Sequence, residues 1–126
     1  MLIIRGRDGV EISFDADVEK LFDWENGCAR LKKKIGVELA RAAKLRIDQM
    51  KASETFWEYL AMRLGKPHVL SGDLSDCYAV SVSANFRLII APQVDDFSPE
   101  ILKCCKKVIV KGVVEYHGGK NEWIVP

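Results

Sequence analysis

Two histidines, a tyrosine and an arginine are the side chains of this sequence best suited to acid–base and phosphate chemistry. His117 follows Tyr116 at the end of an apolar run and precedes two glycines, a position where side chains face a cleft. Histidine exchanges protons near neutral pH, and tyrosine adds a hydroxyl group and a ring on which a base can stack. The structural alternative is a strand-terminal histidine that is hydrogen-bonded to a loop carbonyl.

Arg87 lies in an otherwise apolar run, residues 86–90, and strand alternation places it on the face opposite its two neighbours. A guanidinium at such a position must be paired or must reach solvent. Its planar fork can grip a phosphate and stabilise a pentacovalent transition state. An ion pair with Asp73, Asp76 or Glu115 is the structural alternative.

The four cysteines indicate neither a disulfide framework nor a metal site. They show no CxxC pair, and the adjacent Cys104 and Cys105 cannot bond each other without strain. A zinc site built from these two with His68 and His117 matches no standard ligand spacing. We therefore expect reduced, mostly buried thiols in a cytoplasmic chain, with no metal and no cofactor.

The chain has 126 residues and a formal net charge of +1, which predicts one domain over residues 1–126. Its charge is segregated: residues 30–51 carry a net +6, and residues 103–120 carry a net +4. Such a distribution can attract phosphate locally, although a solvated helix face is the alternative. No run approaches the roughly 20 apolar residues of a membrane span, so we expect no membrane contact.

Helical periodicity dominates the first half of the chain, and strand alternation dominates the second half. The first half predicts a strand over 2–14, one or two helices over 15–35, a break at Gly36, and helices over 37–51 and from Ser53 to about residue 64. The second half predicts strands at 68–70, 77–82, 86–90 and 108–116, a bulge at Gly112 and a helical turn at 101–105. The expected class is α+β, with N-terminal helices packed on a small antiparallel sheet.

Three motifs occur in a distinctive order: Gly-Asp-Leu at 72–74, Asn-Phe-Arg-Leu-Ile-Ile at 85–90, and Val-Val-Glu-Tyr-His at 113–117. Together with the basic segment before them, they resemble the HigB-type branch of the RelE/ParE toxins of bacterial type II toxin–antitoxin systems, over residues 11–117. The resemblance implies a RelE-like fold and a ribosome-dependent endoribonuclease that cuts messenger RNA and inhibits translation. It also implies metal-independent attack by the ribose 2′-hydroxyl, and neutralisation by a helix-turn-helix antitoxin through which any DNA contact is indirect.

The resemblance also assigns roles to single residues. Arg87 matches an arginine that stabilises phosphate charge, and His117 matches a general acid or base. Many relatives carry a lysine where this chain has Ser71, so Lys66 or His68 is expected to replace the missing ammonium. The expected catalytic residues are His117, Arg87 and Tyr116, and the expected substrate-binding residues are His68, Lys66, Glu115, Lys111 and Lys120.

Two other functions stay open at the level of sequence. One is a non-catalytic, ParE-like inhibitor of DNA gyrase, and the other is a degenerate module that only binds its antitoxin. The Tyr-His ending favours the nuclease, because the ParE branch does not need it. The nuclease hypothesis requires Arg87 and His117 to converge on one concave, positively charged surface.

Overall fold

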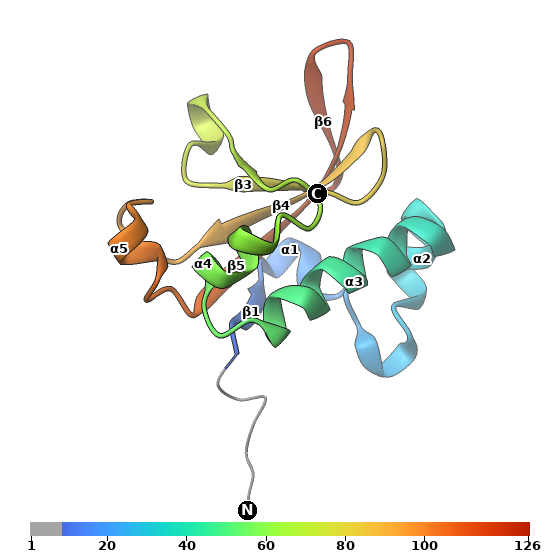
Figure 1. The fold of residues 1–126 in the computed structure, drawn as a ribbon. Helices are drawn as coiled ribbons and strands as arrows, with labels where there is room; N and C mark the ends of the chain where they lie inside the picture. The colour runs from blue at the N-terminus through green and yellow to red at the C-terminus, as the bar shows by residue number, and fades with distance from the viewer. Residues whose placement is uncertain (1–8) are drawn as a thin grey trace, which may run out of the picture.

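The computed structural model describes residues 9–126, in which six strands form one sheet with helices packed on one face (Figure 1). The strand order is β1-β5-β4-β3-β2, and β6 also pairs with β5. The strands are β1 (Glu11–Phe14), β2 (His68–Val69), β3 (Tyr78–Ser81), β4 (Phe86–Pro92), β5 (Lys107–His117) and β6 (Lys120–Val125). The expected α+β class is therefore confirmed.

The sheet is mixed, whereas the sequence predicted an antiparallel one. β1 runs parallel to β5, with Glu11 opposite Lys107 and Phe14 opposite Val110, and every other pairing is antiparallel. Parallel neighbours need a long connection, which the intervening helices and hairpin supply. Residues 2–8 of the predicted first strand lie outside the described residues.

Within residues 9–126, seven helical segments connect or cover the strands. They are α1 (Ala16–Glu19), η2 (Trp24–Asn26), α2 (Ala29–Ile35), α3 (Val37–Ala52), α4 (Phe56–Met62), η3 (Gly72–Leu74) and α5 (Pro99–Leu102). Gly27 and Cys28 have φ angles of 64° and 56°, which interrupt the predicted helical region over 15–35. The predicted break at Gly36 is confirmed, because its φ of 92° separates α2 from α3.

The main core lies between the helices and one face of the sheet. α3 buries Ala40, Ala43, Ile47 and Met50, the apolar stripe that its sequence predicts. The sheet contributes Tyr78, Val80, Leu88, Ile90, Val108, Val110 and Val113 to the same cluster. Burial of each larger side chain contributes about 1.5–3 kcal/mol, which fixes α3 against the strands.

A smaller buried cluster lies on the opposite face of the sheet. It consists of Cys77, Ala79, Ile89, Ala91 and Val114, on which Leu70 and Leu74 pack. We call this side of the sheet the second face.

The β5–β6 hairpin is the main element that the sequence did not predict, and it projects away from the helices (Figure 1). His117 pairs with Lys120, so Gly118 and Gly119 form a two-residue loop in which their φ angles are 59° and 77°. Positive φ at both loop positions is what the favoured hairpin turn requires. The sequence pattern predicts only a strand that ends at residue 116, just before this turn.

The bulge predicted at Gly112 is confirmed. Ile89 pairs with Gly112 and Ile90 with Val110, which leaves Lys111 as the extra residue of β5. Beyond the bulge, β5 alternates regularly to its end, and this alternation decides which face each candidate side chain occupies.

Candidate nucleic-acid interface

A basic groove of about 500 Å³ lies beside the end of β3 and the turn that leads into β4. Four of its lining side chains are cations and none is acidic. The lining residues are Arg46, Arg63, Leu64, Gly65, Lys66, Ser81, Ser83, Ala84 and Arg87. A surface of this charge favours an anionic ligand.

The loop between α4 and β2 holds two of these cations in an unusual backbone conformation. Arg63, Gly65 and Lys66 all have positive φ angles, of 57°, 74° and 50°. The left-handed region costs a non-glycine residue roughly 1–2 kcal/mol, and such outliers concentrate at functional sites. Gly65 lies directly on β3: its carbonyl accepts the Ser81 amide at 2.7 Å, and a β-carbon at position 65 would lie 2.5 Å from Val80.

Arg46 is the one residue of α3 that lines the groove. Its Nε donates to the Ser81 carbonyl at 3.0 Å, and its Nη1 donates to Gln49 at 3.0 Å, so its guanidinium is held in place. Lys44 and Lys51 instead lie over the ring of Trp24, 5.5 and 5.8 Å from its centre. The basic helical segment is therefore divided between two sides of the molecule.

Arg87 lines the groove without an acidic partner. Its Nη1 donates to the carbonyls of Ser83, Ala84 and Phe86, at 3.1–3.3 Å. Within residues 9–126 no carboxylate forms an ion pair with it, so the alternative of a structural pair is not observed. Its Nη2 and Nε make no hydrogen bond to a described residue, and they are left to meet an anion.

Tyr116 is the predicted site residue that lies against Arg87. The guanidinium carbon of Arg87 is 5.7 Å from the centre of the Tyr116 ring. The Tyr116 amide donates to the Asn85 carbonyl at 2.6 Å, which ties the end of β5 to the β3–β4 turn. Tyr116 is 43% exposed, so part of the residue is accessible beside the groove.

His117 does not share that face. Arg87 pairs with Val114, so alternation along β5 puts Arg87 and Tyr116 on the second face of the sheet and His117 on the other. The convergence of Arg87 with His117 that the sequence analysis required is therefore not observed. Whether Arg87 and His117 lie on the same face depends on the register between β4 and β5, which the alternation within one strand does not reveal.

The imidazole of His117 is paired within its own hairpin. Its Nε2 lies 2.9 Å from the Glu122 carboxylate, and Glu115 pairs directly with Glu122 across the strands. The hydrogen bond to Glu122, reinforced by the charges of Glu115 and Glu122, raises the pKa of His117 above its ordinary value. When it is protonated, the imidazole offsets the repulsion between these two facing carboxylates.

His68 lies on the second face with Arg87, since it pairs with Ala79 of the buried cluster there. Its Nδ1 lies 3.1 Å from the Lys66 carbonyl, which can only accept a hydrogen bond. The neutral ring therefore carries its proton on Nδ1, and Nε2 is left as a proton acceptor. Lys66 and His68, the two expected substitutes for the missing lysine, are joined by this contact.

The remaining predicted binding residues lie away from the groove. Lys111 forms an ion pair with Asp15 at 3.1 Å near the parallel edge of the sheet. Lys120 lies at the tip of the β5–β6 hairpin, opposite His117. Glu115 shares the face of His117, so it adds no charge to the surface around Arg87.

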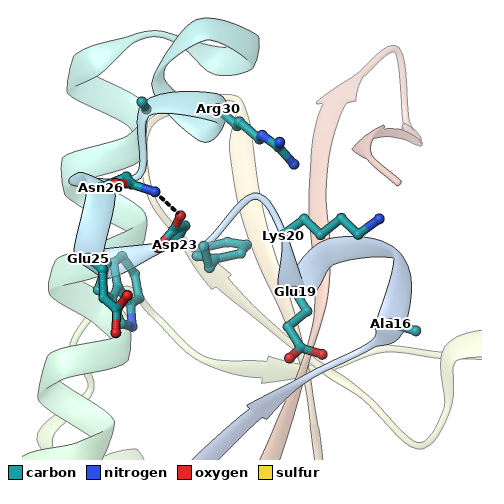
Figure 2. Close-up of a pocket in the computed structure, with 10 residues that line it drawn as sticks. Ala16, Glu19, Lys20, Asp23, Glu25, Asn26 and Arg30 are labelled. Carbon is teal, nitrogen blue, oxygen red and sulfur yellow. Dashed lines mark hydrogen bonds between the residues drawn. The ribbon is translucent and has the colours of Figure 1, made fainter.

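A second hollow, of about 990 Å³, lies along the segment from α1 to α2. Its charged side chains point in different directions and do not converge on one point (Figure 2). Its lining residues are Ala16, Glu19, Lys20, Phe22, Asp23, Trp24, Glu25, Asn26, Ala29 and Arg30. None of the predicted site residues is among them.

Arg46 and Arg63 line the groove but were not among the site residues predicted from the sequence. The run Arg63-Leu64-Gly65-Lys66 could have indicated this part of the groove, because it is a basic, glycine-containing loop just before β2. Within residues 9–126 no group of three or more His, Cys, Asp or Glu side chains could hold a metal ion. No helix in the same part of the chain is long and apolar enough to cross a membrane.

Two solved structures share this arrangement of strands and helices. The YoeB–YefM complex and the YoeB dimer, both from Staphylococcus aureus, each align with a TM-score of 0.50 and 15% identity, over 86% of this chain and 97% of theirs. The chain has a YoeB-like fold. A YoeB/ParE toxin from Agrobacterium tumefaciens aligns with a TM-score of 0.48 and 13% identity, over 86% of this chain and 99% of its own.

No family model matches the sequence, and no curated protein matches it. At 15% identity the likeness to the YoeB structures concerns the fold. The roles of the residues around the groove therefore have to be inferred from the geometry of this chain and not from the YoeB structures.

Proposed function

We propose that this protein is the toxin of a toxin–antitoxin pair and an endoribonuclease that binds single-stranded messenger RNA along the basic groove. The observation that carries the proposal is the position of Arg87, which has no acidic partner among the described residues, lines the groove with three further cations and lies against the Tyr116 ring. The YoeB-like fold supports the same class of protein. The motif order narrows the proposal to the HigB-type branch, which acts on the ribosome in the cytoplasm.

Cleavage by the 2′-hydroxyl requires three tasks. A base removes the 2′-hydroxyl proton, a cation stabilises the phosphorane, and an acid protonates the departing 5′-oxygen. We assign the second task to Arg87 and the third to the Tyr116 hydroxyl, because Tyr116 lies against Arg87. We assign the first task to Nε2 of His68, which does not itself line the groove but lies on the same face of the sheet and contacts Lys66 of the groove. The products are a 2′,3′-cyclic phosphate and a 5′-hydroxyl, and the proposed steps use no metal.

A partner protein follows from the same proposal. One of the similar structures is a complex of YoeB with YefM, which supports a bound partner for this chain. We propose a helix-turn-helix antitoxin, which would contact DNA itself and silence the toxin. A short neighbouring reading frame that encodes a helix-turn-helix protein would support this partner.

The test is cleavage of messenger RNA by the purified protein in the presence of ribosomes, followed by mapping of the 5′ ends. Arg87→Ala is expected to slow cleavage by roughly 100-fold or more, since it removes the group that stabilises the phosphorane. Lys44→Ala is the matched control, because that cation is paired with Asp48 and lies over Trp24. Full cleavage by Arg87→Ala would contradict the proposal.

The two histidines are separated by the same assay. His68→Ala is expected to lose roughly 10²–10⁴-fold in rate, the usual contribution of a general acid or base, and His117→Ala much less. A loss confined to His117→Ala would return the role of base to that residue. Intact messenger RNA with DNA-damage signalling would indicate a ParE-like gyrase inhibitor, and absence of toxicity with tight antitoxin binding would indicate a degenerate module.

A further inference from the structure

Trp123 lies in line with Arg87 on the second face of the sheet. Arg87 pairs with Val114, and Val114 pairs with Trp123, so the three residues form one row across β4, β5 and β6. Tyr116 is two residues further along β5 on the same face, and it contacts Arg87. An arginine and two aromatic residues therefore lie on one surface of the sheet.

The Trp123 side chain packs against the sheet but remains exposed to solvent. Its ring lies against Gly112, where an added β-carbon would be 3.0 Å from the ring atom Cζ3. The side chain is nevertheless 40% exposed, and Tyr116 is 43% exposed. Both rings thus offer accessible surface while their backbones are fixed in the sheet.

The anchoring of β6 does not depend on this tryptophan. Val125 is fully buried, and Ile124 packs against the main core on the opposite face. A single exposed hydrophobic side chain needs no special explanation. The alignment of Trp123 with Tyr116 and with a cation that lines the basic groove does call for one.

We propose that Trp123 and Tyr116 form a base-stacking platform for single-stranded RNA whose phosphate is bound at Arg87. Diagonal neighbours on paired strands lie roughly 7–8 Å apart, so each ring stacks with a separate base. Aromatic stacking combined with a positively charged groove is how single strands are commonly held. The identity of the ligand rests on the function proposed above, whereas the platform itself requires only binding.

The charge around the platform favours a nucleic acid over an apolar protein segment. Arg87 joins the rings to the groove, where Arg46, Arg63 and Lys66 add three positive charges and no lining residue is acidic. The acidic residues of the hairpin, Glu115 and Glu122, lie on the other face. A single-stranded nucleic acid suits both parts of this surface, because its phosphates can bind the groove cations and its bases can stack on the two rings.

The experiment measures binding of a short, fluorescently labelled 2′-O-methyl RNA, which cannot supply the attacking hydroxyl and so separates binding from cleavage. Trp123→Ala is expected to weaken binding by roughly tenfold, within the range measured for a lost base stack, whereas Trp123→Phe retains most of the affinity. Leu45→Ala is the matched control, because Leu45 is an exposed apolar residue on α3. Thermal melting of each variant confirms that it is folded.

Salt dependence gives a second readout. Trp123→Ala is expected to leave the slope of log affinity against log salt unchanged, because it removes no charge, whereas Arg87→Ala makes that slope shallower by about 0.7. RNA should also quench tryptophan fluorescence less in Trp123→Phe than in Trp57→Phe. Unchanged RNA affinity in a folded Trp123→Ala protein would overturn the platform, as would a loss confined to binding of a partner protein.

The two proposals fail in different ways. Ring-dependent binding of the RNA without any cleavage on ribosomes would refute the nuclease and leave the platform in place. Normal cleavage with the same RNA affinity in wild-type and Trp123→Ala protein would leave the nuclease and remove the platform.

Discussion

Arg87 and His117 differ in what satisfies their polar atoms, and this difference separates their roles. Arg87 is held by carbonyl oxygens, which orient the guanidinium without neutralising its charge. His117 is held by the Glu122 carboxylate, which stabilises its protonated form. An oriented, unneutralised cation is ready to meet a phosphate, whereas the imidazole already has an anion.

Glu122→Gln is expected to lower the pKa of His117, because it removes the hydrogen-bonded carboxylate that raises it. A pKa raised by folding adds stability below the unfolded value of about 6.5, and this contribution is lost as pH rises through the folded value. The wild-type hairpin should thus loosen as the pH rises through that range, and the variant should lose most of this dependence. An NMR titration of each protein measures the first effect from the His117 ring signals and the second from the amide signals of the hairpin, and an unshifted His117 curve would contradict the assignment.

At the level of elements, much of the sheet follows from local patterns. The alternating runs predicted β3, β4 and β5, and the glycine at 112 predicted the bulge that the register confirms. The parallel pairing of β1 and the face of His117 depend on register between distant strands, which no single segment encodes. The basic groove was missed for a similar reason, because α3, the 63–66 loop and β4 come together only in the folded chain.

At Gly112 the backbone of β6 lies so close to β5 that there is no room for a β-carbon, and Gly112→Ala tests this close approach. A β-carbon there would lie 1.9 Å from the Val125 carbonyl oxygen, and the backbone φ is +148°. We expect a loss of about 2–4 kcal/mol in the free energy of unfolding, measured by urea denaturation. Gly72→Ala is the control, since its φ is +67° with nothing within 4 Å, so it carries only backbone strain of roughly 1–2 kcal/mol. Equal losses in the two variants would show that β6 does not press on Gly112.

For the whole molecule, a net charge of +1 does not show that some of its cations are paired with acidic side chains or with Trp24, whereas others line the groove. Lys44 is paired with Asp48, Lys111 with Asp15, and Lys51 lies over Trp24. The cations that line the groove make no ion pair within residues 9–126. A nearly neutral protein can therefore present one strongly positive surface at one end of its sheet.

Binding of single-stranded RNA should consequently depend on salt as though a few phosphates were involved. Four groove cations that each neutralise one phosphate give a slope of log affinity against log salt of about −3, at roughly −0.7 per contact. Lys66→Ala should make that slope shallower by about 0.7, whereas Lys51→Ala should leave it unchanged, because Lys51 lies over Trp24. Fluorescence anisotropy across a salt series measures both variants against the wild-type protein. A steeper wild-type slope that Lys51→Ala reduces would mean that RNA follows the outer faces of α2 and α3, as the charge of residues 30–51 predicted, and that the groove is only part of a longer track.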